Sequence, residues 1–355
     1  MKVLHAPTNI AGQASILSRS ERALGHVSDV LVFDQYVYNY PCDYNLRLNT
    51  RPKVVWPFIV LAYLLFSILK YDVFHFHYRK SFLPGNLDLP ILKLLRKKVI
   101  MHYWGSDIIQ TDIAVNYTRL TQKDLQDIYP NQDNEKIRAR LRWIEKHTDV
   151  TIVGDYSLLP FSPNSIVVRQ AVDLEGISFV GSGTREGAVR IVHAPTNRKV
   201  KGTHLILPVV EQLISEGYPI EFILVENKPH TEALAIYKEA DIVIDDVLQG
   251  PYGIFAIECM SLGKPVLDRI DEKLVGFYKD LPIQNTPPEA IYERLKTLIE
   301  NPLMREELGR QGREYVERNH NPLEIARQLV IMYGTEDLRL LGKAAQRCSS
   351  VDVKQ

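Results

Sequence analysis

A short run of cations in the second half of the chain has the residue types that hold an anion. The segment Asn197-Arg198-Lys199-Val200-Lys201-Gly202-Thr203 follows an apolar, strand-like run and precedes a helical pattern. Backbone N–H groups at a helix N-terminus, the helix dipole and the side chains of Lys and Arg all favour a phosphate. These residues suit a diphosphate, and a solvated basic turn would have the same composition.

One carboxylate lies in an otherwise apolar helical run. Glu258 is flanked by Ile257, Cys259 and Met260, and a Gly-rich segment, 250–253, precedes it. Burial of a carboxylate is costly unless another group balances its charge or donates hydrogen bonds to it. The two hydroxyl groups of a ribose would supply such donors, and a salt bridge to Lys or Arg is the structural alternative. Glu258 is therefore a candidate ligand-binding residue.

Two polar segments of the first half, 8–13 and 102–107, also follow strand-like runs. In open α/β sheets, ligands bind at the carboxyl ends of the strands. The first segment is compatible with a site loop and with a plain turn. The second combines His, Trp and Asp, which is more than a solvated turn needs, so we expect it in an active site. The candidate residues are Asn9, Gly12 and Gln13 in the first segment and His102 and Asp107 in the second.

A repeated sequence indicates that two similar domains follow one another. Residues 4–9 read Leu-His-Ala-Pro-Thr-Asn, and residues 192–197 read Val-His-Ala-Pro-Thr-Asn. Each copy follows an apolar run and leads through a polar loop into a helical pattern, over 14–24 and 203–214 respectively. A chance match of five identical residues is improbable. The repeat predicts two β/α domains that each open with a strand, a loop and a helix.

Short Val- and Ile-rich runs alternate with helical segments, which is typical of parallel sheets covered by helices. The predicted fold class is α/β, with two Rossmann-like, doubly wound domains that face a cleft. We expect domains over 1–180 and 188–318, with a polar linker, 181–187, between them. Residues 319–355 are expected to form helices that return to the first domain, and 107–146 a helical excursion of the first domain. The predicted strands are 1–4, 27–33, 73–77, 99–103, 150–153, 165–168, 189–192, 221–225, 241–244 and 265–267.

Several stretches resemble one enzyme family. Residues 240–266 contain ADIVID and GPYGIFAIECMSLGKPV, which resemble the "aDv" and "EGFG…E-A-M-A-x-G-x-P-V" stretches of the family 4 glycosyltransferases. These are retaining nucleotide-sugar enzymes of the GT-B fold. Residues 71–77, YDVFHFH, resemble the "yDvvHaH" strand of that family, and 172–175, VDLE, its "GvDlerF" turn. Residues 301–333 resemble its C-terminal helices, so the resemblance covers nearly the whole chain.

The resemblance implies a role for each candidate residue. Glu258 would hold the donor ribose, and Arg198 with Lys201 the diphosphate. His102 and Asp107 would be catalytic. The segment containing Asn9, Gly12 and Gln13 would face the donor phosphates and the acceptor. The complete donor-binding set is Asn197, Arg198, Lys201, Gly202, Lys228, Tyr252, Gly253 and Glu258. The family usually carries a second Glu that contacts the donor sugar, and in this sequence Gly250 stands at that position.

The implied activity is that of a hexosyltransferase that needs no metal and no cofactor. It would move a sugar from a nucleotide-diphosphate sugar to a glycan, a lipid-linked molecule or a small molecule, with retention of configuration. Two alternatives stay open. Gly250 is compatible with a catalytically silent, glycosyltransferase-like binding subunit, and the GT-B fold is compatible with a nucleotide-sugar epimerase.

The bulk composition limits partners and location. The 355 residues carry a formal net charge of zero and the pI is near 7.2, which does not suggest capture of nucleic acid. Three distant cysteines and an N-terminus without signal-peptide features indicate a cytoplasmic protein. The apolar run 54–69, flanked by cations, is predicted either as a buried helix or as a helix lying in a membrane interface at the inner face of the membrane; a true span would need a longer run.

Overall fold

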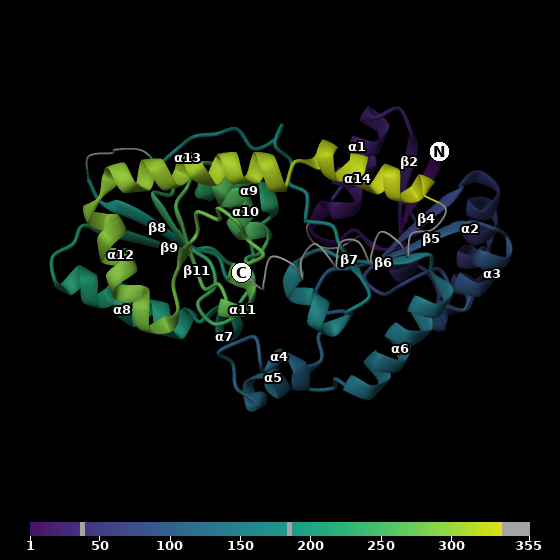
Figure 1. Cartoon of the computed structure of the whole chain (residues 1–355), viewed down its shortest axis with the longest axis horizontal. Coiled ribbons are helices and arrows are strands. Elements are labelled where there is room, and N and C mark those ends of the chain that lie inside the picture. Colours follow the sequence, from purple (N-terminus) through teal and green to yellow (C-terminus); the bar gives the residue numbers. More distant parts are fainter. Residues whose placement is uncertain (36–39, 183–186, 336–355) are drawn as a thin grey trace. The chain divides into compact units, whose positions relative to one another are not determined.

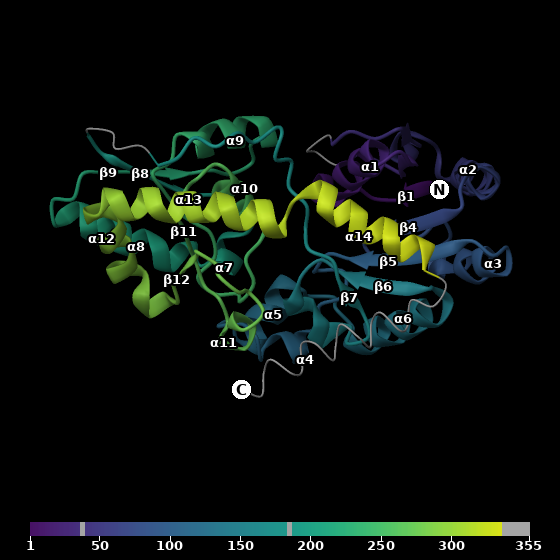
Figure 2. The same ribbon diagram turned by 45° about the horizontal axis from the view of Figure 1, so that its top comes forward.

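The computed structural model describes residues 1–35, 40–182 and 187–335, and the chain divides into two compact units. The first unit comprises residues 1–110, 133–171 and 322–355, and the second 111–132 and 172–321. Each unit contains one parallel sheet flanked by helices, as Figures 1 and 2 show. The α/β class predicted from alternating strands and helices is confirmed.

Seven strands form the sheet of the first unit, in the order β3-β2-β1-β4-β5-β6-β7. Every neighbouring pair is parallel, and the register places His5 beside His75 and His77 beside His102. Histidines from three adjacent strands therefore lie together in the sheet. The strands are β1 (Lys2–Ala6), β2 (Val27–Val32), β3 (Tyr44–Asn45), β4 (Val73–His77), β5 (Lys98–Tyr103), β6 (Val150–Val153) and β7 (Ile166–Val167).

Helices cover both faces of this sheet. The chain crosses from β1 to β2 through one helix and moves in the opposite direction from β3 to β4, β4 to β5 and β5 to β6. Right-handed crossovers therefore place α1 on one face and α2, α3 and α6 on the other. The C-terminal helix α14 packs against α1 (Figure 1). These helices are α1 (Gln13–Ala23), α2 (Trp56–Lys70), α3 (Asp88–Leu94), α6 (Asn134–His147) and α14 (Pro322–Gly334).

The core of the first unit joins the two ends of the chain. Leu329 and Met332 of α14 pack in one cluster with Val3 of β1 and Ile100 of β5. A fully buried Leu or Met side chain contributes about 1.5–3 kcal/mol relative to an exposed one. The first unit is therefore completed by a helix that lies more than 300 residues after its first strand in the sequence.

Five strands form the sheet of the second unit, in the order β12-β11-β10-β8-β9, and all pairs are parallel. The strands are β8 (Val189–His193), β9 (Ile220–Leu224), β10 (Ile242–Ile244), β11 (Val266–Asp268) and β12 (Gln284–Asn285). The helices are α4 (Thr111–Ala114), α5 (Gln122–Ile128), α7 (Arg198–Lys201), α8 (Thr203–Ser215), α9 (His230–Lys238), α10 (Ile254–Ser261), α11 (Glu272–Val275), α12 (Ile291–Glu300) and α13 (Pro302–Asn319).

The segment expected as a helical excursion of the first domain, 107–146, is divided between the units. Helix α6 belongs to the first unit, whereas residues 111–132 belong to the second. Backbone and side-chain bonds explain this assignment, because the N–H of Arg119 and the hydroxyl of Thr118 both donate to the carbonyl of Leu248. The boundary between the two units lies between residues 171 and 172, whereas the sequence predicted that the first domain ends at 180. Residues 183–186 of the expected linker lie outside the described residues.

Helix α2 does not bury most of its apolar side chains. Within it only Val60, Leu64 and Ser67 are buried, while Phe58 is 71% exposed and Leu69 is 88% exposed. In the described part of the chain, this is the one helix long and apolar enough to cross a membrane, a test that core helices of soluble proteins also pass. The interpretation of 54–69 as a buried helix is wrong, because a single face of the helix supplies all of its contacts with the core.

Candidate functional site

Charged side chains gather at the carboxyl end of the second sheet. Asp245 follows β10, Asp268 ends β11, and Lys201 ends the short helix α7 that follows β8. The Lys201 Nζ lies 2.6 Å from Asp245 Oδ1 and 3.5 Å from Asp246 Oδ2. The sequence predicted Lys201 as a diphosphate contact; in the structure its charge is balanced by carboxylates of the protein.

These groups shift each other's protonation. Burial opposes the charge on Lys201, but Asp245, Asp246 and Asp268 outweigh it and raise the pKa of the ammonium. Burial, together with repulsion from Asp245 and Asp246, raises the pKa of Asp268 well above its usual value. Neither carboxyl oxygen of Asp268 has a hydrogen-bond partner in the described part of the chain. The cluster is therefore one lysine among three acids, and Asp268 is the acid whose pKa is raised by burial and by the like charges beside it.

The loop before α8 is shaped by its own contacts. The Asn197 side chain accepts from the N–H groups of Lys199 and Val200 and so caps α7. Gly202 has φ +75°, and a Cβ there would lie 2.4 Å from the Val247 side chain, so only glycine fits this turn. Asn197 and Gly202 therefore shape the predicted anion loop through their own contacts within the protein.

Arg198 is more accessible than Lys201. It is paired with Glu226 through two hydrogen bonds, one of 2.8 Å from its Nε, and its side chain is 56% exposed. Lys228 is exposed as well and lies 3.8 Å from Glu232. Exposed pairs of this kind are easily exchanged for a stronger anion, because solvent already competes with them. Of Arg198 and Lys201, the two predicted diphosphate contacts, Arg198 is therefore the one that lies open to solvent.

Glu258 keeps one carboxylate oxygen open. Its Oε1 lies 2.7 Å from His230 Nε2, and this hydrogen bond to a carboxylate raises the pKa of His230. The Oε2 has no hydrogen-bond partner among the residues that the structure describes. The sequence offered a Lys or Arg salt bridge as the alternative to a ligand; the partner is a histidine at the start of α9, which sequence reasoning missed.

Three positions before Glu258 in the sequence, Gly250, Tyr252 and Gly253, have different surroundings. Gly253 lies at the N-terminus of α10, and a Cβ there would be 4.0 Å from Asp245 Oδ2, so it is part of the charged edge. Tyr252 points away, because it is buried and its hydroxyl bonds the hydroxyl of Tyr315 and His320. At Gly250 a Cβ would lie 2.8 Å from the carbonyl oxygen of Tyr117. The position at which the family usually has Glu therefore has no room for a side chain.

In the first unit, Asp107 closes a tight loop after β5. Its Oδ1 accepts from the backbone N–H groups of Trp104 and Gly105 at 3.0 and 2.8 Å. Its Oδ2 is buried without a partner in the described chain. Burial raises the pKa of Asp107 to about 6. Asp107 therefore fixes the loop that carries Trp104, and Trp104 stacks on His102 with ring centroids 3.8 Å apart.

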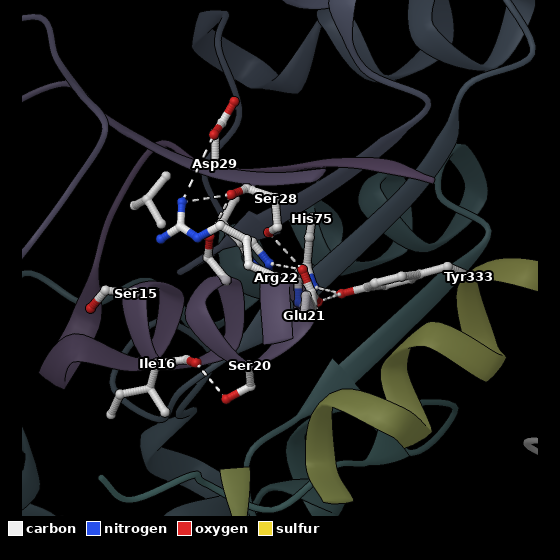
Figure 3. Close-up of polar contacts among 12 residues, drawn as sticks. Ser15, Ile16, Ser20, Glu21, Arg22, Ser28, Asp29, His75 and Tyr333 are labelled. Atoms are coloured by element: carbon white, nitrogen blue, oxygen red, sulfur yellow. Dashed lines mark hydrogen bonds and ion pairs between the residues drawn. The ribbon is translucent and has the colours of Figure 1, made fainter. Parts of the chain in front are cut away.

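His102 belongs to a buried network of histidines. His75 Nε2 lies 3.2 Å from His102 Nδ1, and His75 Nδ1 lies 2.6 Å from the Tyr333 hydroxyl. Tyr333 donates to Glu21 Oε1 at 2.9 Å. Figure 3 shows Tyr333 reaching from α14 to Glu21 of α1 and His75 of β4. Burial lowers the pKa of His75 and His102 well below the usual value, so both rings are neutral.

A second branch of the network ends at the same carboxylate. Trp104 Nε1 donates to His77 Nδ1 at 3.1 Å, His77 Nε2 lies 3.0 Å from His5 Nδ1, and His5 Nε2 lies 3.0 Å from Glu21 Oε2. An indole N–H can only donate and a carboxylate can only accept. These two ends fix the hydrogens between them: His77 carries its hydrogen on Nε2, and His5 also on Nε2.

The same rule fixes the first branch. Tyr333 gives its hydrogen to Glu21, so its oxygen accepts from His75 Nδ1. The neutral His75 ring then accepts through Nε2 from His102 Nδ1. His102 Nε2 is left with a lone pair, and it is buried with no hydrogen-bond partner in the described chain. The network thus makes His102 a hydrogen-bond acceptor at the carboxyl end of β5.

This cluster does not fit a metal. The ligand atoms of His5, His75 and His77 lie within 4.8 Å of one another, but the rings are stacked, with 10° between the planes of His75 and His77. Ring nitrogens bind metals through lone pairs that lie in the ring plane, so stacked rings do not converge on one ion. The nitrogens of these three rings are also used by the hydrogen bonds of the network. Sequence reasoning found no signal for the parts that Glu21 and Tyr333 play in this network.

The predicted phosphate loop of the first unit, residues 8–13, forms hydrogen bonds with other parts of the same unit. Asn9 donates to Ser15 Oγ and to the carbonyl of Pro41. Gln13 exchanges two hydrogen bonds with the backbone of Ala171, at 2.8 and 2.9 Å. Gly12 directly precedes α1. These contacts favour the plain structural turn that the sequence left open for this segment.

Comparison with known proteins extends the description of the fold. No protein-family profile matches the chain. An uncharacterized glycosyltransferase of Methanocaldococcus jannaschii is 21% identical over 255 residues, which cover 69% of this chain and 70% of that protein. Sucrose-phosphate synthase from Thermosynechococcus elongatus has a TM-score of 0.66 at 16% identity, covering 93% of this chain and 97% of that structure. Anabaena HepE, in complex with UDP and glucose, has a TM-score of 0.62 at 12% identity, covering 94% and 99%.

The chain has the GT-B fold. The GT-B fold is not tied to one chemistry. A UDP-GlcNAc 2-epimerase from Neisseria meningitidis, bound to UDP-GlcNAc, matches with a TM-score of 0.52 at 14% identity over 94% of this chain and 99% of that structure. At these identities the structural likeness gives the fold, and the activity has to be argued from the residues of the site.

Proposed function

We propose that this GT-B protein is a glycosyltransferase that takes its sugar from a nucleotide-diphosphate sugar, with donor binding in the second unit. The observation that carries the proposal is Glu258, whose Oε1 is held by His230 while Oε2 stays open at the charged edge of the sheet. A carboxylate held in this way can accept hydrogen bonds from the two hydroxyls of a ribose. The relative from Methanocaldococcus jannaschii supports the transferase assignment.

In this proposal the diphosphate meets Arg198 and the N-terminus of α8. Arg198 exchanges Glu226 for the phosphate, and the backbone N–H groups after Gly202 add the helix dipole. Lys201 contributes indirectly, because it holds Asp245 and Asp246 and so fixes the loop between β10 and α10. We propose transfer of a hexose with retention and without a metal, by resemblance to family 4, and a cytoplasmic location.

His102 supplies the acceptor atom that the first unit offers to a sugar. Its Nε2, which is buried without a partner in the described chain, would accept from the hydroxyl of a sugar that enters the first unit, while Trp104 and His75 hold the ring in place. Asp107 contributes indirectly, because it fixes the loop that carries Trp104. Positioning of this kind, rather than proton transfer by a charged group, is the contribution that the neutral His102 ring can make.

A screen of UDP-, GDP-, ADP-, CMP- and dTDP-sugars by thermal shift tests the proposal. We expect one nucleotide class to stabilise the protein, and Glu258→Gln to weaken that ligand without lowering the melting temperature of the free protein. Glu232→Gln, which removes an exposed carboxylate of the neighbouring helix α9, separates loss of a negative charge in general from loss of the ribose contact. If no nucleotide sugar binds, or if Glu258→Gln binds normally, donor binding at this edge is refuted.

The epimerase alternative is favoured by the likeness to the Neisseria meningitidis enzyme, and the silent-subunit alternative by the closed position at Gly250. Incubation with the nucleotide sugar identified by the screen distinguishes the three. A transferase slowly releases free sugar to water, an epimerase converts the sugar while it stays on the nucleotide, and a silent subunit leaves the donor unchanged.

A further inference from the structure

A large cavity lies wholly within the first unit, apart from the histidine network. Its volume is about 850 Å³, within the range of pockets that hold small molecules. Its wall combines the N-terminal turns of α2 with the loops after β2 and β4 and with one residue of α6. Apolar side chains, among them Trp56, Val60, Leu61 and Phe82, form one part of the lining, and Lys53, Arg79, Lys80 and Arg140 supply the cations.

Two of these cations are half-buried without a counter-ion. Arg79 and Arg140 have no carboxylate within salt-bridge distance in the described chain. Burial lowers the pKa of Arg140, and the positive charge of Arg79 lowers it further, so the two guanidinium groups repel each other. The nearby Asp88 carboxylate offsets part of this effect on the pKa of Arg140, but it forms no ion pair with either arginine in the described chain, and its oxygens accept from Ser81 and from two backbone N–H groups.

The acidic residue in the lining of the cavity is Asp34, because Asp88 lies outside it. Its Oδ1 accepts from the backbone N–H of Asn49 at 2.8 Å, and no cation of the cavity is within salt-bridge distance of it in the described residues. Two like charges held together without an anion are costly unless a ligand supplies the anion. The guanidinium pair therefore points to a phosphate, the group for which Arg has matching geometry.

The apolar wall continues onto the surface. Val54, Phe58, Leu61, Leu65 and Leu69 recur every three or four residues and are between 48% and 88% exposed. They form one stripe along α2 and the turn that precedes it, opposite to the face that buries Val60 and Leu64. Leu61 belongs to both the stripe and the cavity lining. An apolar chain could therefore lie continuously from the cavity to the exposed stripe.

We propose that this cavity binds a phosphate-bearing lipid, with the phosphate between Arg79 and Arg140 and the hydrocarbon chain along Trp56, Val60 and Leu61. The α2 stripe then rests in the membrane from which the lipid enters. Neither a free sugar nor inorganic phosphate matches a lining that combines apolar side chains with two guanidinium groups unpaired in the described chain. Resting on the proposed function, this assigns the lipid as the acceptor: a phosphate oxygen of the lipid bonds to the anomeric carbon of the donor sugar, the bond from that carbon to the nucleoside diphosphate breaks, and the nucleoside diphosphate leaves. Binding of the lipid itself does not depend on that function.

Calorimetric titration of the full chain with farnesyl phosphate, farnesol and inorganic phosphate tests the cavity. We expect farnesyl phosphate to bind and the two fragments not to bind at the same concentration. Arg140→Gln should weaken farnesyl phosphate about tenfold or more, as loss of a charge-assisted hydrogen bond does. Arg142→Gln is the matched control, because Arg142 is an exposed arginine of the same helix outside the cavity.

Three outcomes would overturn the proposal: no binding of farnesyl phosphate, equal weakening by Arg140→Gln and Arg142→Gln, or equally tight binding of inorganic phosphate. The last outcome would mean a soluble phosphate ligand. Because UDP-sugar binding is measured separately on the same protein, failure of the lipid site leaves the donor assignment intact, and failure of the donor assignment leaves the lipid site intact.

Sedimentation with vesicles of phosphatidylcholine and phosphatidylglycerol tests the stripe. The double variant Phe58→Gln/Leu65→Gln removes exposed apolar side chains and should lose vesicle binding with the fold retained. The control is Leu303→Gln, since Leu303 is 76% exposed on α13 of the second unit. Unchanged sedimentation of the double variant, or equal loss in the control, would show that the stripe is not the membrane contact.

Discussion

At the scale of single residues, Arg198 and Lys201, two of the three cations of the anion loop, have different roles. Lys201 lies 2.6 Å from Asp245 in a site that water scarcely reaches, whereas Arg198 shares its charge with Glu226 at the surface. Breaking a buried pair leaves one charge uncompensated, and breaking an exposed one exchanges a protein partner for water. Both residues are basic and lie in the same short segment of the sequence. Only their surroundings in the folded protein distinguish a structural lysine from a ligand-binding arginine.

We therefore expect Lys201→Ala to lower the free energy of unfolding of the second unit by about 3–5 kcal/mol, because Asp245 loses its partner. Arg198→Ala should leave stability nearly unchanged and weaken binding of nucleoside diphosphates more than that of nucleosides. Urea unfolding and ligand titration measure the two effects. A stable Lys201→Ala protein that has lost diphosphate binding would restore Lys201 as the phosphate contact.

Asp107 gives a pH dependence whose sign follows from its burial. Its folded-state pKa is raised to about 6 from the ordinary 3.8, so the folded protein holds the proton more tightly than the unfolded chain. The contribution of the Asp107 carboxyl to the free energy of unfolding is fully present below pH 4. It falls by about 3 kcal/mol as the pH rises to about 6. Asp107→Asn still accepts from the two loop N–H groups and cannot ionise.

Urea unfolding of both proteins, followed by tryptophan fluorescence at pH 4.5 and 7.5, checks this dependence. The stability of the wild type relative to Asp107→Asn should fall between the two pH values. A difference that is constant across this range would mean that Asp107 ionises without penalty and does not couple loop formation to pH.

At the scale of elements, helix α14 connects distant parts of the sequence. Tyr333 on this helix bonds both Glu21 of α1 and His75 of β4, and through His75 it sets which nitrogen of His102 carries hydrogen. Packing of α14 on α1 places the hydroxyl with the accuracy that a hydrogen bond needs. Helix α14, which lies outside the strand–helix repeat, thereby determines which nitrogen of His102, at the end of β5, accepts a hydrogen bond.

We predict that Tyr333→Phe reverses the tautomer of His102. Without the hydroxyl, His75 Nδ1 has no acceptor, so His75 is expected to move its hydrogen to Nε2 and donate to His102 Nδ1, leaving the hydrogen of His102 on Nε2. Imidazole proton–nitrogen correlation NMR reads this change directly. The unpaired oxygen of Glu21 should also lower stability by about 1–3 kcal/mol.

Tyr315→Phe, which removes another buried tyrosine hydroxyl, controls for lost packing and should leave the His102 spectrum unchanged. With an active donor, Tyr333→Phe should reduce kcat more than donor affinity. A His102 ring that keeps its bare Nε2 in Tyr333→Phe would show that the relay through His75 does not set the tautomer.

At the scale of the whole molecule, donor binding is expected to stabilise the two units unequally. A nucleotide at 100 times its dissociation constant adds about 2.7 kcal/mol to the state that binds it. Hydrogen exchange with UDP or another bound nucleotide should slow in the loop 197–203, in α9 and in α10, and remain unchanged in α2. Slower exchange confined to the first unit would place the nucleotide site there instead.

The sequence by itself determined the architecture and the identity of the charged segments. Alternating short apolar strands and helices predict parallel α/β sheets because those periods reflect burial on both faces, and ten strands were predicted within about two residues. The HAPTN repeat marks β1 and β8 because each domain opens with the same local structure. Local chemistry also singled out Glu258, Arg198 and His102, since residue type and position after a strand are local properties.

Tertiary structure alone decided what each of these residues does. The pairing of Lys201 with Asp245, the closed position at Gly250 and the attachment of 111–132 to the second unit depend on contacts between residues far apart in sequence. The same holds for the link from Glu21 through Tyr333 to His102 and for the stripe of α2. Propensity and periodicity report which face of an element is apolar, but the partner that meets that face, or its absence, follows only from packing of the whole chain.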